Sequence, residues 1–412
     1  MLVLFCFADL SGGGHNVGGL GSFEPEVRIA ARRASPESPI DLRVAKAVGS
    51  KGYDKVRVSV ISPGGGSVSL QHLDPDAYND TFRYRWEASF DLGVAHTACG
   101  ASGVYNHSYM KYDADCLLAC THDDRCRHYT WYDGAKACEL ATACSYEAAP
   151  LAQATYSTPG RNVLASAVVS LSPGDNELHI GGHTVSIHLP AEGAGVRGVV
   201  ISDPCYSGRW VGCQWGQEWD TLNRTSRMLN ALAAGGDLDF FGILGDNFYD
   251  QDGRLTKALW NTLSLDFKRR YLLTTPGNHD IWVPGGPPGD QYDQYGWGFA
   301  QFYGQDSIAS TTAKGGLLDF EGGGPDVQRD WGGLNNNASN FFFYHSLGNL
   351  GFIGYNGGAT AHAQLAYFTE ACAYMGRARP AAVLLLGHWN DASSGCPSGA
   401  DVPEVRESTG GQ

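Results

Sequence analysis

Three short polar segments, each directly after an apolar run, constrain this chain more than any other feature. They are Gly245-Asp246-Asn247-Phe248-Tyr249, Pro276-Gly277-Asn278-His279-Asp280 and Gly387-His388-Trp389-Asn390. The preceding runs are short and apolar, which predicts buried strands at 238–244, 271–275 and 382–386. A fourth such run, 197–202, leads into Asp203. Because sites in helix-covered sheets assemble at the carboxyl ends of strands, we expect these side chains to meet and to form a two-metal centre.

The chain from residue 196 onward alternates strand patterns with helix patterns. Apolar side chains recur near helical spacing in 217–234, which ends at Gly235-Gly236, and in 364–375, which ends at Gly376. Two further strands, 341–346 and 350–355, are separated by Gly348-Asn349 and predict a hairpin. This alternation is typical of an α/β fold.

The preceding half of the chain is dominated by strand patterns. Apolar and polar side chains alternate over 56–61 and 82–86, and further strands are predicted at 165–171, 177–180 and 183–189. Gly181-Gly182 predicts a two-residue hairpin turn between the last two. We infer a small β-sandwich into which the intervening cysteine-rich segment is inserted.

Cysteines and sequons favour a secreted or lumenal protein. Five of the 11 cysteines lie between 116 and 144, and no pair of C-x-x-C knuckles occurs. Disulfide bonds are therefore a better interpretation of these cysteines than a zinc site. We expect a disulfide between Cys205 and Cys213 as well. Four Asn-x-Ser/Thr sequons begin at Asn79, Asn106, Asn223 and Asn337. Residues 1–8 are apolar but short, which leaves two interpretations open: the end of a signal peptide, or a truncated or misassigned N-terminus.

Composition excludes several classes of protein. A hydrophobic fraction of 43% with 17% charged residues is typical of a globular protein. The net charge of −14 argues against a nucleic-acid partner, because phosphate backbones require a basic surface. No apolar run approaches the ~20 residues that span a bilayer, so no transmembrane anchor is expected.

The polar segments resemble the motifs of the metallophosphoesterase (calcineurin-like) superfamily, and more narrowly those of purple acid phosphatases. Gly245, Asp246 and Tyr249 match the second motif of that family, and Gly277 to Asp280 match the third. Val383 to His388 match the fourth loosely. The resemblance implies an α/β four-layer sandwich of β-sheets flanked by helices, with the β-rich region and the cysteine-rich module preceding it.

The resemblance also implies a set of roles. The metal ligands would be Asp203, Asp246, Tyr249, Asn278 and His388, with Asp246 bridging two metal ions. A phenolate ligand from Tyr249 implies iron, paired with zinc, manganese or a second iron. His279 would contact the substrate or protonate the leaving oxygen, and Asp280 would orient His279. The alternatives are a packed strand-end tyrosine for Tyr249 and a hydrogen-bonded core histidine for His388.

Two motifs depart from the family pattern. The first retains only its aspartate, since the segment reads Asp203-Pro204-Cys205. The last motif, Gly-His-x-His, has no counterpart after His388. We therefore expect the chain to be cut short at its C-terminus and, as it stands, to be poorly active.

The cysteine-rich segment, 99–160, resembles a PAN/apple module. The resemblance rests on Cys116-x3-Cys120-x5-Cys126 and on Cys138-Glu139-Leu140. It implies a helix stapled to a hairpin, disulfides Cys120–Cys126, Cys116–Cys138 and Cys99–Cys144, and a protein or carbohydrate ligand. The alternative is a generic disulfide-bonded loop.

These observations predict five parts: 1–40, a signal remnant or disordered segment; 41–98, a β-rich region; 99–160, the module; 161–195, linking strands; and 196–412, the metallophosphoesterase domain. The function expected from the resemblance is that of an acid phosphatase-like phosphoric monoester hydrolase, in which a hydroxide held by two metal ions attacks a phosphomonoester at acidic pH. The alternatives are a phosphodiesterase of the same superfamily, or a non-catalytic binding protein that uses the module.

Overall fold

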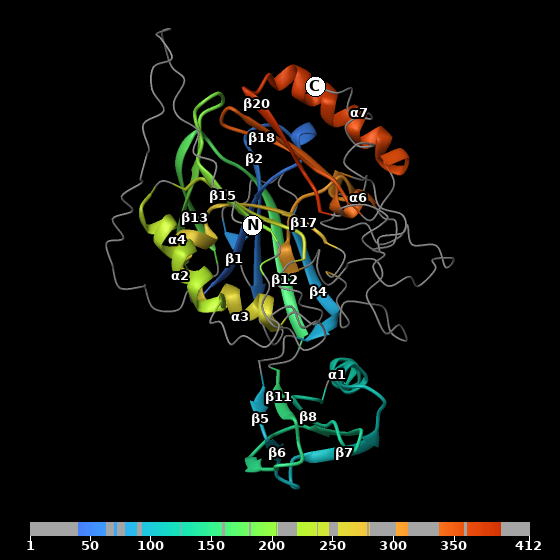
Figure 1. Ribbon diagram of the computed structural model, residues 1–412. Helices are drawn as coiled ribbons and strands as arrows, with labels where there is room; N and C mark the ends of the chain where they lie inside the picture. The colour runs from blue at the N-terminus through green and yellow to red at the C-terminus, as the bar shows by residue number, and fades with distance from the viewer. Residues whose placement is uncertain are drawn as a thin grey trace, which may run out of the picture.

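The computed structural model describes residues 40–62, 70–71, 79–88, 93–123, 125–158, 161–180, 183–202, 204, 221–236, 238–246, 254–277, 280, 302–311, 338–357 and 361–388. Figure 1 shows a larger body built around two sheets, with the cysteine-rich module below it. Across these ranges, every helix is too short or too polar to cross a bilayer.

The larger sheet of the body has seven strands. Their order is β15 (Gly198–Ile201), β16 (Phe240–Leu244), β17 (Tyr271–Thr275), β1 (Asp41–Lys46), β2 (Lys55–Ser62), β12 (Arg161–Ser170) and β4 (Asn79–Ala88). Neighbouring strands from β15 to β1 are parallel, and those from β1 to β4 are antiparallel. The parallel strand β17 is buried along its whole length and β16 along all but its last residue, because both faces of the sheet are covered there.

A second, three-stranded sheet packs against the first. It contains β18 (Phe343–Leu347), β19 (Leu350–Gly354) and β20 (Ala382–Leu386) in that order. β18 and β19 form the predicted hairpin, and β20 lies parallel to β19. Apolar side chains from both sheets, among them Val44, Leu273, Phe352 and Leu386, form the core between them.

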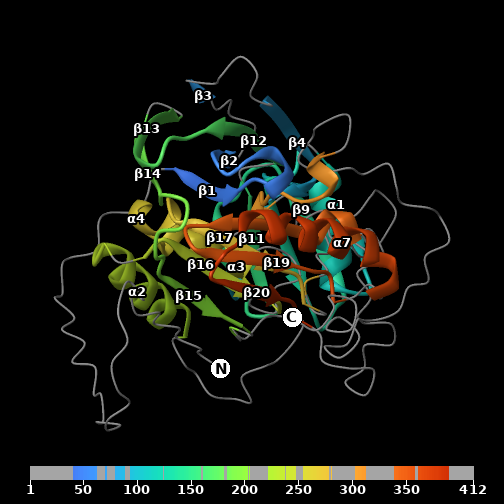
Figure 2. The same cartoon turned by 90° about the horizontal axis from the view of Figure 1, so that it is seen from above.

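Helices cover the outer faces of the two sheets. The seven-stranded sheet packs against α2 (Thr221–Ala234), α3 (Arg254–Thr262) and α4 (Leu265–Lys268) through a core that includes Ile243, Leu259, Trp260 and Phe267. The three-stranded sheet packs against α7 (Ala361–Ala378) through a core that includes Ile353, Phe368 and Met375. In Figure 1, and from above in Figure 2, α2 and α4 lie on one side of the sheets and α7 on the other. The predicted four-layer sandwich is therefore confirmed.

The predicted separate β-sandwich in the first half of the chain is wrong. β1, β2, β12 and β4 extend the same sheet that contains β15 to β17, and β1 joins it through Val44 opposite Tyr271. A separate three-stranded sheet contains β14 (His183–Leu189), β13 (Gly174–Ile180) and β3 (Leu70–Gln71). The alternating pattern located these strands, but it carries no information about which distant strand each one pairs with.

The start of one predicted strand in the second sheet differs from prediction. The strand expected at 341–346 begins at Phe343, because residues 338–341 form the short helix α6 (Ala338–Phe341). The helix expected from 217 is described from Thr221 onward, and its predicted start lies outside the described residues. The expected Cys205–Cys213 disulfide lies outside the described residues.

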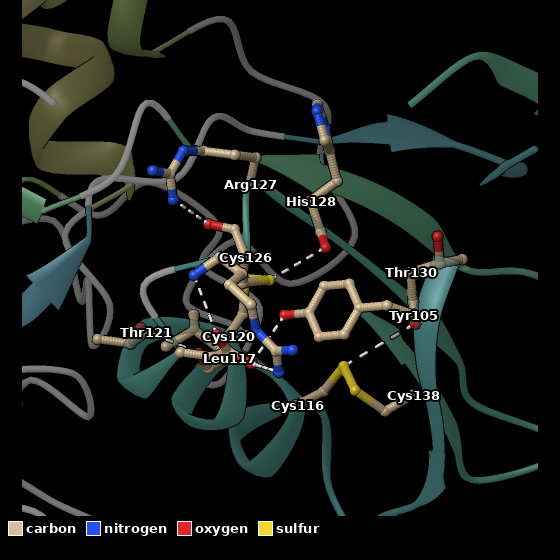
Figure 3. Close-up of a disulfide and its surroundings, with 12 residues drawn as sticks. Tyr105, Cys116, Leu117, Cys120, Thr121, Cys126, Arg127, His128, Thr130 and Cys138 are labelled. Atoms are coloured by element: carbon tan, nitrogen blue, oxygen red, sulfur yellow. Dashed lines mark hydrogen bonds and ion pairs between the residues drawn. A yellow bond between two sulfur atoms is a disulfide. The ribbon is translucent and has the colours of Figure 1, made fainter. Parts of the chain in front are cut away.

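The cysteine-rich module packs one helix, α1 (Asp113–His122), against a five-stranded sheet. The order is β5 (Val94–Ala95), β11 (Ala154–Ser157), β8 (His128–Tyr132), β9 (Ala137–Ala141) and β7 (Val104–Tyr109), beside a pair formed by β6 (Thr97–Cys99) and β10 (Tyr146–Ala148). All three expected disulfides are confirmed: Cys99–Cys144, Cys116–Cys138 and Cys120–Cys126. In Figure 3 the second of them joins α1 to β9, so the helix is stapled to the β8–β9 hairpin as the resemblance implied.

Candidate metal centre

Three of the seven candidate site residues lie in the described part of the chain. Asp246 follows β16, Asp280 follows the turn after β17, and His388 follows β20. Asp203, Tyr249, Asn278 and His279 lie outside the described residues. The structure brings the ends of β16, β17 and β20 together, although β20 belongs to a different sheet from the other two.

A left-handed turn positions the Asp246 carboxylate. Gly245 has φ +69° and Asp246 has φ +46°, so the chain reverses sharply after β16. The Gly245 N–H still donates to Thr275 O at 2.9 Å, which ties the turn to β17. Asp246 is only 3% exposed. An ionised carboxylate this buried requires a compensating cation or donors.

Two glycines allow the polar segments to approach one another. A Cβ atom on Gly277 would lie 2.2 Å from Asp246 N and Oδ1, and one on Gly245 would lie 2.1 Å from Cγ of His388. Neither distance is possible between unbonded atoms. The glycines before Asp246 and before Asn278 are therefore required by the contacts among β16, β17 and β20.

His388 faces the carboxylate of Asp246. Its Nε2 atom lies 3.5 Å from Asp246 Oδ2, and its Nδ1 atom lies 3.1 Å from Leu244 O. A carbonyl can only accept, so Nδ1 carries a proton and donates to Leu244 O. In the neutral ring this leaves the lone pair on Nε2, directed toward Asp246, which is the arrangement that a metal-ligating histidine requires.

Asp280 closes the turn that follows β17. Its Oδ2 atom accepts the Gly277 N–H at 2.6 Å, and the residue is fully buried. This contact holds Gly277 against Asp246. The expected role of Asp280 in orienting His279 involves a residue outside the described ranges and stays a prediction.

Sequence reasoning missed three groups at this edge. Leu244 O orients His388 and also accepts the Ser202 hydroxyl at 2.7 Å. The ring of Tyr355, which follows β19, packs against Gly387. Leu244 O is a backbone atom, which no side-chain pattern reveals. Ser202 and Tyr355, in contrast, are the last residues of the predicted strands 197–202 and 350–355, and their position could have indicated them.

His345 does not join the centre. It is buried between the sheets, where its ring stacks with Phe343 and contacts Phe352. Burial, together with the positive charge of Lys46, lowers its pKa to about 3. It is therefore a neutral core residue.

Asp246 and His388 fit a metal ion. Ligand atoms that share one ion at about 2.1 Å lie about 3 to 3.5 Å apart, and the observed separation is 3.5 Å. A carboxylate oxygen with an imidazole nitrogen suits zinc, iron or manganese. A second group of potential ligands among the described residues, Cys99, His128 and Cys144, is a disulfide beside a histidine.

The chain was also compared with known proteins. Residues 196–394 match the family model described as calcineurin-like phosphoesterase. No curated protein sequence gives a significant match. Among solved structures, the chain is similar to the purple acid phosphatase PPD1 isolated from yellow lupin (Lupinus luteus) seeds. The identity is 15% and the TM-score 0.37, over 85% of this chain and 51% of the lupin chain, so this chain spans about half the length of the lupin enzyme. The chain therefore carries a calcineurin-like metallophosphoesterase domain over residues 196–394.

Proposed function

We propose that this chain is a metal-dependent phosphoric ester hydrolase of the acid phosphatase type that acts on phosphomonoesters. The observation that carries the proposal is the contact between His388 Nε2 and Asp246 at the edge where β16, β17 and β20 end. The family match over 196–394 supports it.

The proposed ligands are Asp203, Asp246, Tyr249, Asn278 and His388, holding iron together with zinc, manganese or a second iron. Such a pair of ions supplies a nucleophile at moderate pH and neutralises charge on the phosphoryl oxygens. Within this chain, Leu244 O would hold the His388 tautomer, Asp280 would hold the turn at Gly277, and His279 would deliver a proton to the leaving oxygen.

We further propose that residues 99–160 act as a separate module that tethers the enzyme to a protein or carbohydrate, outside the cell or in a lumen. Three disulfides support an oxidising compartment, where such bonds persist.

Metal content tests the centre directly. The full chain, purified from a secretory host, is analysed for bound metals and for a visible absorption band, beside Asp246→Asn and the control Asp175→Asn, whose side chain is 76% exposed. We expect two metals per chain, one of them iron, in the wild type and in Asp175→Asn. Asp246→Asn should lose metal affinity about tenfold or more, because mutating even a residue that only hydrogen-bonds a metal ligand typically has an effect of that size. Equal metal content in all three proteins would refute the assigned centre.

The substrate class is tested separately with p-nitrophenyl phosphate and bis(p-nitrophenyl) phosphate. We expect low rates with both, because the last motif has no counterpart after His388, and faster hydrolysis of the monoester than of the diester. Faster hydrolysis of the diester would favour a phosphodiesterase, and metal binding without hydrolysis of either would favour a non-catalytic scaffold.

A further inference from the structure

The module's sheet has an open edge formed by β7. On one side β7 pairs with β9, with His107 opposite Glu139 and Tyr109 opposite Ala137. On its other side it pairs with no strand among the described residues. Figure 1 places β7 on the lower side of the module, away from the two sheets of the body. A free strand edge presents unpaired N–H and C=O groups that can pair with another chain.

The side chains of β7 do little to discourage such pairing. Tyr109 is 77% exposed, and His107 is exposed as well. β7 has six residues, a length typical of strands, and carries no lysine, arginine or proline. The one irregularity is a bulge at Tyr105, between Val104 and Asn106.

A glycosylation sequon lies in the middle of this edge. Asn106-His107-Ser108 has the Asn-x-Ser pattern, and Asn106 is exposed on β7. Within the described part of the chain, the Asn106 amide makes no hydrogen bond. Asn176 and Asn230, in contrast, use theirs to bond backbone groups. The side-chain amide of Asn106 is therefore accessible to a modifying enzyme, and no hydrogen bond of the described fold depends on it.

The other sequons differ in setting. Asn223 is exposed on α2, away from any sheet edge. The side chain of Asn79, and all of Asn337, fall outside the residues whose side chains are described. Of the two sequons whose side chains are described, Asn106 is therefore the one at which a glycan would lie beside a strand edge and obstruct pairing with another chain.

We propose that Asn106 carries an N-linked glycan that shields the β7 edge from pairing with a second chain. In the transfer, the amide nitrogen of Asn106 bonds to C1 of the first sugar of a lipid diphosphate-linked oligosaccharide. The bond from C1 to the diphosphate breaks, the lipid diphosphate leaves with the bonding electrons, and the nitrogen loses one proton. The three disulfides are typical of secreted and lumenal proteins, and in eukaryotic cells such proteins are the substrates of this reaction.

Without the glycan, two copies of β7 can pair antiparallel across a two-fold axis, because such an interface uses the same surface of both partners. A branched oligosaccharide attached at mid-strand prevents that approach by its bulk and hydration. The proposal does not depend on the hydrolase activity.

The test uses the full chain secreted from eukaryotic cells. Peptide mass spectrometry before and after an N-glycosidase shows whether Asn106 is modified, and size-exclusion chromatography with light scattering gives the oligomeric state of wild type, Asn106→Gln and the control Asn223→Gln. We expect a glycan on Asn106 and a several-fold rise in dimer or larger species for Asn106→Gln but not for Asn223→Gln. The double variant Asn106→Gln/Tyr109→Lys should return to monomer, because an edge lysine disfavours pairing.

Two results overturn the proposal: an unmodified Asn106, or an Asn106→Gln protein as monomeric as wild type. If Asn106→Gln fails to fold, wild-type protein treated with N-glycosidase after folding gives the same comparison. Treated protein that stays monomeric would equally refute the shielding role.

Discussion

The imidazole Nε2 of His388 lies 3.5 Å from a carboxylate oxygen of Asp246, although the two residues follow strands of different sheets. The contact exists only because the sheets pack face to face with β16 and β20 ending at the same edge. Any change that separates the sheets there should therefore affect the candidate metal centre.

Gly245→Ala should disrupt this contact. The new methyl group would overlap the His388 ring, and φ of +69° is unfavourable for alanine. We expect a loss of about 1 to 3 kcal/mol in the free energy of unfolding, together with weaker metal binding. Urea unfolding and metal titration measure both. Gly134→Ala is the control, because a Cβ at Gly134 meets no atom within 4 Å. Equal stability of the two variants would contradict the close packing of Gly245.

Asp306→Ala should destabilise the body strongly. Asp306 is fully buried and accepts from Arg57 Nε at 2.7 Å and from Val48 N at 2.6 Å. Burial alone would raise its pKa, but Arg57 and Lys51 hold the pKa below its usual value. Removing the carboxylate leaves Arg57 charged and buried, at a cost of about 3 to 5 kcal/mol.

Chemical denaturation measures this loss. Asp133→Ala is the matched control, since Asp133 forms an exposed pair with Lys136 worth about 0 to 1 kcal/mol. A similar small effect for Asp306→Ala would show that the Arg57 pair contributes little.

The body should lose stability in acid through His345. Its pKa in the folded protein is about 3, lowered by burial and by Lys46 of β1, against about 6.5 in the unfolded chain. Between about pH 3 and 6.5, His345 is protonated in the unfolded chain but remains neutral in the folded protein. Stability therefore falls as the pH drops from about 6.5 toward 3, with a slope of up to about 1.4 kcal/mol per pH unit.

His345→Phe removes this titration and keeps an aromatic ring beside Phe343 and Phe352. We expect a flatter dependence of the unfolding free energy on pH, measured by urea unfolding across that range. His107→Gln, at an exposed histidine, should keep the wild-type slope. An unchanged slope in His345→Phe would mean that other groups cause the acid sensitivity.

The disulfides of the module should differ in what they contribute. Cys99–Cys144 closes 45 residues and Cys120–Cys126 closes 6. Loop-closure entropy predicts stabilisation of about 4 kcal/mol for the first and about 2 kcal/mol for the second. Thermal unfolding of the two double cysteine-to-alanine variants should show the larger loss for Cys99/Cys144. The reverse order would indicate that burial of Cys120 and Cys126 outweighs loop length.

Local sequence patterns located most of the strands. The apolar runs predicted at 271–275 and 382–386 are β17 and β20, residue for residue, and the alternation at 56–61 lies within β2. In β2, Val56, Val58 and Val60 face the core between the sheets, whereas Arg57 and Ser59 bond to the segment around Asp306 and Gly304. Alternation is visible in a sequence because it reflects which face each side chain meets.

Local patterns along the chain therefore specify which elements form and which polar residues follow them. Two features become apparent only in the folded protein: β1 pairs with β17 rather than belonging to a separate sandwich, and His388 lies beside Leu244 O. These contacts join residues far apart in the chain. They depend on how the apolar faces of the sheets pack and on which backbone carbonyls remain available as acceptors. The spacing of side chains along a single strand specifies neither.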